Sequence, residues 1–295
     1  MGKARKLPAY TTRLGRAYHG DAFEILQIIP DESVSLVFTS PPFALRRQKA
    51  YGNVSAAQYI DWFWPIADQI LRVLRKDGSF VMELGGAWNP GSGTRSLFPY
   101  ELLLRLGKIF CLAQDFYWFN PSRLPSPAEW VTIRRTRVKE AVTTLWWLSK
   151  TTEPQADNRQ VLVPYSKSMK RLLKDGYKAA KRPSQHEIGP HFQRDNGGAI
   201  PPNLLTVPNT RSYDEYLFRC RAAGLPIHPA RFPPELPDFF IRFLTKPGQT
   251  VLDPFAGSNV TGQVAEALGR NWASVEINAD YVAGSKLRFG DAEAA

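Results

Sequence analysis

The sequence predicts an α/β protein built on a doubly wound, mostly parallel, Rossmann-like sheet. Three observations support this class: short apolar or β-branched runs alternate with helical patterns, turn residues separate them, and the 295 residues suffice for one large domain or two ordinary ones. A hydrophobic fraction of 43% and a charged fraction of 22% exclude extensive disorder. No apolar run is long enough to span a membrane, and the N-terminus lacks the apolar core of a secretion signal.

The first predicted elements are a short helix and a buried strand. Residues 22–29 place their apolar side chains on one face at helical spacing. Residues 33–38 (SVSLVF) are short, β-branched and bounded by turn residues, as in a strand buried on both faces. Pro41 and Pro42 follow this strand, and because proline has no N–H to donate to a sheet, we expect a rigid turn at its carboxyl end.

The alternation of helices and strands continues through the first half of the chain. Helical patterns lie at residues 57–74 and 100–110, and strand patterns at 79–84, 114–119 and 141–148. Lys76-Asp77-Gly78 follows the first of these helices, and we expect Gly78 to cap its end, because glycine is favoured just after a helix.

A loop-rich segment then interrupts the pattern. Periodicity fades from residue 149 to about 224, where proline, asparagine, glycine and basic residues accumulate, so we expect an inserted subdomain at 151–224. The residues from 290 onward are expected to fray. Between these segments the α/β pattern returns, with predicted helices at 237–244, within 257–268 and at 279–288, and predicted strands at 250–253 and 271–276.

The charge of the chain favours a polyanionic partner. The formal net charge is +11 and the pI is about 9.7, which suits nucleic acid, although a basic balance can also serve solubility alone. The excess lies in the middle of the chain, so we expect the DNA-binding residues there. They are Arg123, Arg134, Arg135, Arg137 and Lys139 before the insert, and Arg182 and Asn196 within it.

One chemical motif lies at residues 251–262 (VLDPFAGSNVTG), where a strand, an acidic residue and a loop of small residues precede a helix. Open α/β sheets bind cofactors at this position, and Gly257 allows close approach of the backbone. Asp253 would repel a diphosphate but suits a cationic amino-acid group, and Glu276 ends the next strand, where a carboxylate binds a ribose diol. A nucleoside that bears an amino acid and no phosphate is S-adenosylmethionine; the alternative is an ordinary turn with two surface acids.

A second motif is the turn Thr39-Ser40-Pro41-Pro42-Phe43. Prolines stiffen the backbone and leave carbonyl groups free to accept hydrogen bonds beside an aromatic ring. Such a turn suits a flat ligand with an exocyclic amine, because the ring can stack while the carbonyl and hydroxyl accept the N–H groups. Taken alone, the turn could equally do no more than end a strand.

Together the two motifs resemble those of the amino DNA methyltransferases, which alkylate exocyclic nitrogens of DNA bases. Ser40–Phe43 matches the family pattern [DNS]-P-P-[YFW], and Asp253–Gly262 matches D-x-F-x-G-S-G-T-T-G, with Asn259 in place of a glycine and Val260 in place of a threonine. The resemblance extends to His228–Pro233, which matches H-P-[AT]-x-[FK]-P, and to Gly20-Asp21. It implies the catalytic residues Ser40, Pro41, Pro42 and Phe43, and the cofactor-binding residues Gly20, Asp21, His228, Pro229, Phe232, Asp253, Phe255, Gly257, Ser258, Asn259 and Glu276.

The order of the motifs resembles the circularly permuted beta group of this family. This order implies a catalytic half at 1–150, a target-recognition insert at 151–224 and an S-adenosylmethionine-binding half at 225–295. Such a permutation keeps the same sheet neighbours when the two termini lie close together in space. Serine in the first position of the turn resembles the cytosine-N4 enzymes. Further segments are similar to those of a cytosine-N4 enzyme whose target is CAGCTG: Ser40–Leu45, Asp115–Ser122, Leu124–Pro127 and Asp195–Gly198.

The resemblance implies a reaction on double-stranded DNA in which a flipped cytosine stacks on Phe43 and its amine is held by Ser40 Oγ and the Pro41 carbonyl. No metal and no covalent adduct are expected, since neither Cys111 nor Cys220 follows a proline, as a cytosine-C5 nucleophile would. The alternatives are an adenine-N6 DNA methyltransferase, a methyltransferase of protein glutamine, and a DNA-binding regulator without activity. We expect a prokaryotic cytoplasmic protein, with a restriction endonuclease acting on the same site without a stable complex.

Overall fold

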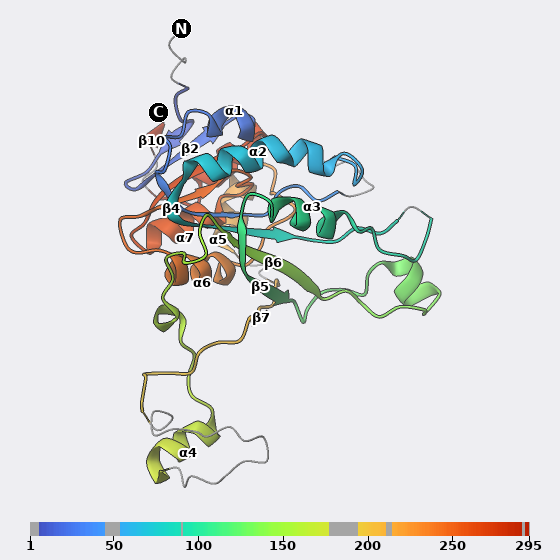
Figure 1. Ribbon diagram of the computed structural model, residues 1–295. Coiled ribbons are helices and arrows are strands. Elements are labelled where there is room, and N and C mark those ends of the chain that lie inside the picture. The colour runs from blue at the N-terminus through green and yellow to red at the C-terminus, as the bar shows by residue number, and fades with distance from the viewer. Residues whose placement is uncertain are drawn as a thin grey trace. The chain divides into compact units, whose positions relative to one another are not determined.

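The computed structural model describes residues 6–44, 54–89, 91–176, 194–210, 214–290 and 293–294. Within them it confirms the predicted α/β class: the strands form one ten-stranded sheet in the order β10-β1-β2-β9-β8-β3-β4-β6-β5-β7, with helices on both faces (Figure 1). The strands are β1 Tyr10–Thr11, β2 Gly15–His19, β3 Val34–Thr39, β4 Leu74–Leu84, β5 Cys111–Phe119, β6 Val142–Ser149, β7 Leu204–Thr206, β8 Thr250–Asp253, β9 Asn271–Glu276 and β10 Glu293–Ala294.

The helices flank the sheet and also occur in the middle of the chain. The α-helices are α1 Ala22–Leu26, α2 Tyr59–Val73, α3 Phe98–Leu106, α4 Lys167–Asp175, α5 Glu215–Ala222, α6 Glu235–Leu244, α7 Val260–Ala267 and α8 Ala279–Lys286. A π-helical turn, Glu129–Ile133, and a 3₁₀ turn, Asn158–Val161, complete the described elements. None of the helices in the described part of the chain is long and apolar enough to cross a membrane.

The centre of the sheet is parallel. β2, β9, β8, β3 and β4 run in one direction, whereas the β4–β6 and β5–β6 pairs are antiparallel. Parallel strands bury both faces, because the connecting helices cover them. β3 shows this in every residue: all six of its side chains are buried.

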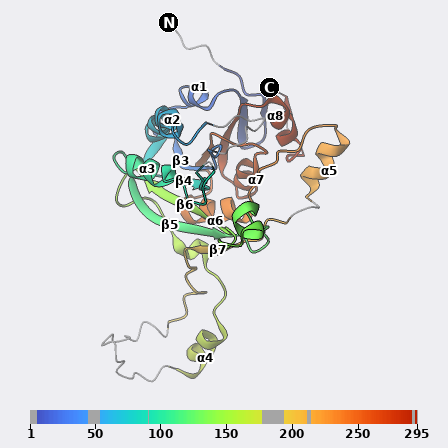
Figure 2. The same ribbon diagram turned by 90° about the vertical axis from the view of Figure 1, so that its right-hand side faces the viewer.

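Two hydrophobic cores fill the space on either side of the sheet, and alternate residues of β3 belong to different cores. Val37 packs in the core with α2 and α3, whereas Leu36 and Phe38 pack in the core with α6 and α7. Figures 1 and 2 show α2 and α3 on one side of the sheet and α6 and α7 on the other. Helices that cover both faces leave the strand ends as the place where a ligand can enter.

The chain divides into two compact units. The larger comprises residues 1–156 and 203–295, and the smaller comprises Asp157–Pro202. The smaller unit therefore lies within the predicted insert at 151–224, whereas residues 203–224 belong to the larger unit. The reason is packing: Tyr216, Leu217 and Cys220 of α5 form a hydrophobic cluster with Leu225, Ile227 and Leu287.

Three local features differ from the predictions. Helix α2 ends at Val73, within one residue of the predicted end at 74, but Gly78 does not cap it, because Leu74 is already extended and opens β4, the strand that pairs with β3. The short strand β2, which the sequence pattern did not predict, pairs with β9 and leads directly to Gly20. The end of the chain is not entirely frayed, since Glu293 and Ala294 pair with β1.

β3 and β8 are direct neighbours at the centre of the sheet, although their sequences lie near opposite ends of the chain. Their parallel register pairs Leu36 with Val251 and Val37 with Leu252. Because the strands run in the same direction, the turn that follows β3 and the loop that follows β8 emerge at the same edge. This adjacency is the spatial condition on which the predicted site depends.

Candidate active site

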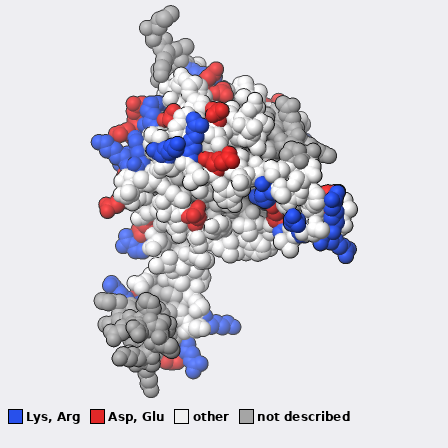
Figure 3. Space-filling view, turned by 45° about the vertical axis from the view of Figure 1, so that its right-hand side comes forward, with Lys and Arg blue, Asp and Glu red and all other residues white. Residues whose placement is uncertain are grey.

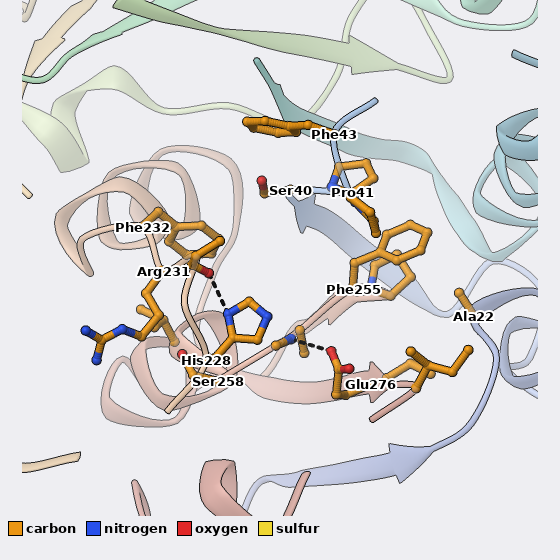
Figure 4. Close-up of a pocket in the computed structure, with 18 of the residues that line it drawn as sticks. Ala22, Ser40, Pro41, Phe43, His228, Arg231, Phe232, Phe255, Ser258 and Glu276 are labelled. Atoms are coloured by element: carbon orange, nitrogen blue, oxygen red, sulfur yellow. Dashed lines mark hydrogen bonds between the residues drawn. The ribbon is translucent and has the colours of Figure 1, made fainter. Parts of the chain in front are cut away.

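A cavity of about 380 Å³ lies where β3 and β8 end, within the size range of small-molecule sites. Figure 4 shows Ser40, Pro41 and Phe43 on one side of it and His228, Ser258 and Glu276 on the other. The cavity thus brings the two sequence motifs together. The predicted residues that line it are Gly20, Asp21, Ser40, Pro41, Pro42, Phe43, His228, Phe232, Phe255, Gly257, Ser258 and Glu276.

The Ser40 hydroxyl donates a hydrogen bond to the carboxylate of Glu83. Glu83 lies near the end of β4, next to β3, and is 4% exposed. Burial raises the pKa of Glu83 to about 7, although the hydrogen bond from Ser40 and the positive charge of Arg123 lower it. A carboxylate with a pKa near neutrality, in contact with a serine hydroxyl, can accept a proton that the serine passes on.

The ring of Phe43 lies directly against the backbone of Gly85. A Cβ atom at residue 85 would lie 2.4 Å from Phe43 Cε2, so only glycine leaves room for the ring in this position. The β4 strand and its following glycine therefore support both Ser40 and Phe43. This places an aromatic face and a hydroxyl group at adjacent positions on the wall of the cavity.

On the other wall, the loop after β8 is held by Glu276 at the end of β9. The Gly257 N–H donates to Glu276 Oε2 at 2.9 Å, and the Asn278 N–H donates to Oε1 at 2.8 Å. Gly257 has a φ of +51°, and a Cβ atom there would lie 2.9 Å from the His228 ring. Burial raises the pKa of Glu276. Glycine at residue 257 thus allows the loop to close against the imidazole.

The imidazole of His228 is neutral and held in one orientation. Its Nδ1 donates to the Ala230 carbonyl at 2.7 Å, and its ring meets Tyr281 edge-on at 4.6 Å. Burial lowers the pKa of His228 to about 4. Near pH 7 this residue presents an uncharged ring to the cavity, which suits packing against a cationic ligand better than an imidazolium would.

Asp253 does not occupy the position expected from the sequence. It is 1% exposed and lies beneath the cavity, and its carboxylate accepts hydrogen bonds from Thr39, Phe255 and Thr261. The carboxylate is therefore buried and held within the protein, and the cavity lining, where direct contact with an amino-acid group was expected, does not include Asp253. Burial raises the pKa of Asp253 to about 6.

Two other predicted residues also lie outside the cavity lining, which does not include Asn259 or Pro229. Asn259 is 1% exposed and has a φ of 56°; its side chain accepts from the Gly262 N–H at 3.1 Å and donates to the Tyr10 hydroxyl at 3.0 Å. It caps α7. Asparagine, which tolerates the left-handed conformation, can therefore stand where the family pattern has glycine.

Sequence reasoning missed several residues of the site. Of the missed residues, Glu83 has the clearest signal in the sequence, since an acidic residue inside the apolar run SFVMEL indicates a buried charge that needs a partner. Trp62 was not predicted as a site residue, yet it lines the cavity, and its ring centre lies 5.7 Å from that of Phe255. The remaining unpredicted lining residues are Ala22, Val54, Ala230, Arg231, Pro254, Ala256, Val260, Val275 and Ile277.

The predicted DNA-binding residues of the first half lie together between β5 and β6, outside the cavity. Figure 3 shows basic side chains gathered on this projecting segment, at the right of the view. Arg134 pairs with Glu129 at 2.7 Å and lies 4.5 Å from the centre of the Trp130 ring, whereas Lys139 donates to the Pro121 and Arg123 carbonyls. The segment also contains Arg135 and Arg137, both exposed.

Arg123 acts electrostatically on Glu83, the partner of Ser40, and its guanidinium donates to Thr143 Oγ1 at 3.3 Å. Asn196 lies in the smaller unit, where its N–H donates to the Tyr165 hydroxyl at 2.8 Å. Arg182 falls outside the described residues.

A Rossmann-like sheet with a Ser-Pro-Pro-Phe turn facing a glycine-containing cofactor loop defines an amino methyltransferase. The chain belongs to the N6_N4_Mtase family of DNA methylases, whose profile matches residues 34–287.

Individual relatives agree with this assignment. The chain is 52% identical over 291 residues to the type II methyltransferase M.PvuII of Proteus hauseri, covering 97% of this chain and 87% of the relative. It is similar to the solved structure of PvuII DNA methyltransferase (cytosine-N4-specific), with a TM-score of 0.80, 46% identity and coverage of 98% and 91% of the two chains. A DNA modification methylase of Thermus thermophilus, TTHA0409, solved with S-adenosyl-L-methionine, has the same fold, with a TM-score of 0.58, 20% identity and 93% coverage of each chain.

The pKa of Glu83 predicts a pH dependence of methylation. Below about pH 7 Glu83 is protonated and cannot accept a further proton, so single-turnover rates should rise with pH with a midpoint near this value. Glu83→Gln should lower the rate by about 100-fold and abolish this midpoint.

The matched control is Asp68→Asn, which neutralises an exposed carboxylate on α2 and should keep both the rate and the profile. A Glu83→Gln enzyme that retains the wild-type midpoint would show that another group titrates.

The contact between Phe43 and Gly85 predicts a steric effect. Gly85→Ala should displace the Phe43 ring and lower kcat/KM for DNA by about tenfold, while cofactor affinity measured by calorimetry stays within about twofold. Gly107→Ala serves as control, because its Cβ atom would meet neighbours at an ordinary 3.4 Å. Equal losses in DNA and cofactor affinity would mean that the substitution disturbs the whole pocket.

Proposed function

We propose that this DNA methyltransferase transfers a methyl group from S-adenosylmethionine to the exocyclic N4 of a flipped cytosine in duplex DNA. The observation that carries the proposal is the single cavity shared by the Ser40-Pro41-Pro42-Phe43 turn and the loop at Gly257. A base-binding wall and a cofactor-binding wall on opposite sides of one cavity are what a direct transfer between two bound molecules requires.

The residues around the loop fit S-adenosylmethionine. Gly257 exposes backbone to the cavity beside the His228 ring, Glu276 offers a carboxylate near the loop for a ribose diol, and Phe255 with Ile277 supplies an apolar wall for a flat base. When bound, this cofactor supplies an electrophilic methyl group. Neutral His228 would pack beside the sulfonium end without adding a second positive charge.

The catalytic turn would hold the target amine and receive its proton. A base buried in a duplex must leave the stack to reach the cavity, and Phe43 offers a ring on which it can stack. Ser40 Oγ and the Pro41 carbonyl accept the two N–H groups of the amine. When the nitrogen takes the methyl group and the bond from that carbon to the sulfonium sulfur breaks, Ser40 Oγ would accept the proton lost by the amine and donate its own hydroxyl proton to Glu83, whose carboxylate it already contacts.

Cytosine is favoured over adenine as the target. Serine occupies the first position of the Ser-Pro-Pro-Phe turn, and the relative with 52% identity has a solved structure described as cytosine-N4-specific. The same resemblance supports CAGCTG as the recognition sequence, with the inner cytosine methylated.

Recognition of duplex DNA would involve both units of the protein. In the larger unit, the segment between β5 and β6 supplies Arg123, Arg134, Arg135, Arg137 and Lys139 for phosphate contacts. In the smaller unit, which we assign to target recognition, helix α4 places four exposed basic residues at spacings of three and four. These are Lys167, Lys170, Arg171 and Lys174.

The cellular setting follows from this assignment. The relative M.PvuII is named as a type II methyltransferase, which supports a restriction endonuclease that cleaves the same site without a stable complex. Both cysteines of the chain are unpaired thiols, which supports the reducing cytoplasm as the compartment.

The direct test is mass analysis of nucleosides from plasmid DNA treated with the protein and labelled cofactor. We expect N4-methylcytosine, and protection of CAGCTG sites from cleavage. N6-methyladenine in place of N4-methylcytosine would refute the cytosine assignment. Ser40→Ala should lower turnover by about 100-fold with unchanged cofactor affinity, because Ser40 lies beside Pro41 and Phe43, on the side of the cavity opposite Ser258 and Glu276.

The basic segment predicts a change in salt dependence. The double substitution of Arg134 and Arg135 by alanine should weaken binding to all duplexes and make the slope of log K against log salt about two units shallower. Replacement of exposed Arg75 and Lys76 by alanine changes the net charge equally and should leave the slope unchanged. An unchanged slope in the first variant would place the DNA elsewhere.

A further inference from the structure

We propose that Thr39 is a positioning residue for methyl transfer, because its hydrogen bond to Asp253 fixes the spacing between the catalytic turn and the cofactor loop. The inference rests on the proposed function of Ser40 and concerns a residue that does not itself reach the cavity lining.

The bond lies where the backbone pairing of the two central strands stops. The β3–β8 ladder pairs Leu36 with Val251 and Val37 with Leu252, and no later pair is formed between these two strands in the described chain. Thr39 and Asp253 are the last residues of their strands. Beyond the ladder, the Thr39 Oγ1 to Asp253 Oδ1 hydrogen bond of 2.6 Å connects the strand ends across 214 residues of sequence.

Each partner is joined directly to one wall of the cavity. Thr39 precedes Ser40 in the chain, so its position sets where the catalytic hydroxyl and the Pro41 carbonyl begin. Asp253 accepts from the Phe255 N–H at 3.1 Å and from Thr261 Oγ1 at 2.7 Å, so its carboxylate also holds the start of the cofactor loop and the first turn of α7. One buried carboxylate therefore ties both walls together.

Burial makes this link rigid. Thr39 is 0% exposed and Asp253 is 1% exposed, so water cannot readily replace the hydroxyl as a donor. Loss of the Thr39 hydroxyl would leave Oδ1 with the Phe255 N–H alone, while the fold would keep the β3–β4 pairing that holds the rest of the strand. The expected consequence is a change in distance between the base and the cofactor rather than loss of either binding site.

The test compares Thr39→Val, Thr39→Ser and Thr261→Val at pH 8, where both Glu83 and Asp253 are ionised. Thr39→Val keeps the shape of threonine but lacks the hydroxyl, and Thr39→Ser restores it. Thr261→Val is the matched control, because it removes a hydrogen bond from the same carboxylate without touching the catalytic strand. Single-turnover methylation, KM for DNA and cofactor affinity by calorimetry are measured for each, with thermal unfolding to verify the fold.

We expect Thr39→Val to lower the single-turnover rate by about 10- to 100-fold with cofactor affinity and KM for DNA within about threefold of wild type. Thr39→Ser should recover most of the rate, and Thr261→Val should weaken cofactor affinity more than it slows transfer. The proposal is overturned if Thr39→Val transfers at the wild-type rate, or if its loss matches that of Thr261→Val in every parameter. A wild-type protein that does not methylate DNA would instead refute the proposed function.

Discussion

The parallel pairing of β3 with β8 is the constraint on which the rest of the site depends. Those strands come from opposite ends of the sequence, and neither of the segments that follow them could support methyl transfer alone. The proline turn would lack a methyl donor, and the glycine loop would lack a methyl acceptor. Their common direction brings both segments to one edge of the sheet. The helices that cover both faces then leave this edge as the entry to the cavity.

Two buried carboxylates under the cavity have different tasks because they have different partners. Asp253 accepts three hydrogen bonds from the protein, so its carboxylate stabilises the contact between the end of β3, the loop after β8 and the start of α7. Glu83 contacts the hydroxyl of Ser40, which lines the cavity, so its charge can change during a reaction. Burial raises the pKa of both, but only the group in contact with a cavity-lining side chain can use that shift for proton transfer.

Much of this arrangement could be predicted from the sequence, because its central strands are continuous apolar runs and its motifs follow them directly. β9 was predicted with its observed bounds, and the turn after β3 follows from two prolines. The direction of the Asp253 side chain could not be predicted, since it depends on hydroxyl groups from β3 and α7 that meet only in the fold. Strand β2 was missed for a similar reason: it is short and polar, and pairing with β9 creates it.

A crystal structure of the protein with S-adenosylhomocysteine, the cofactor after loss of its methyl group, tests the shared cavity most directly. We expect the ligand between Gly257 and Glu276, with its sulfur directed toward Ser40 and with the bond between Thr39 and Asp253 intact. A ligand bound at another edge of the sheet, or in this cavity with its sulfur directed away from Ser40, would contradict the claim that one cavity unites the two ends of the chain.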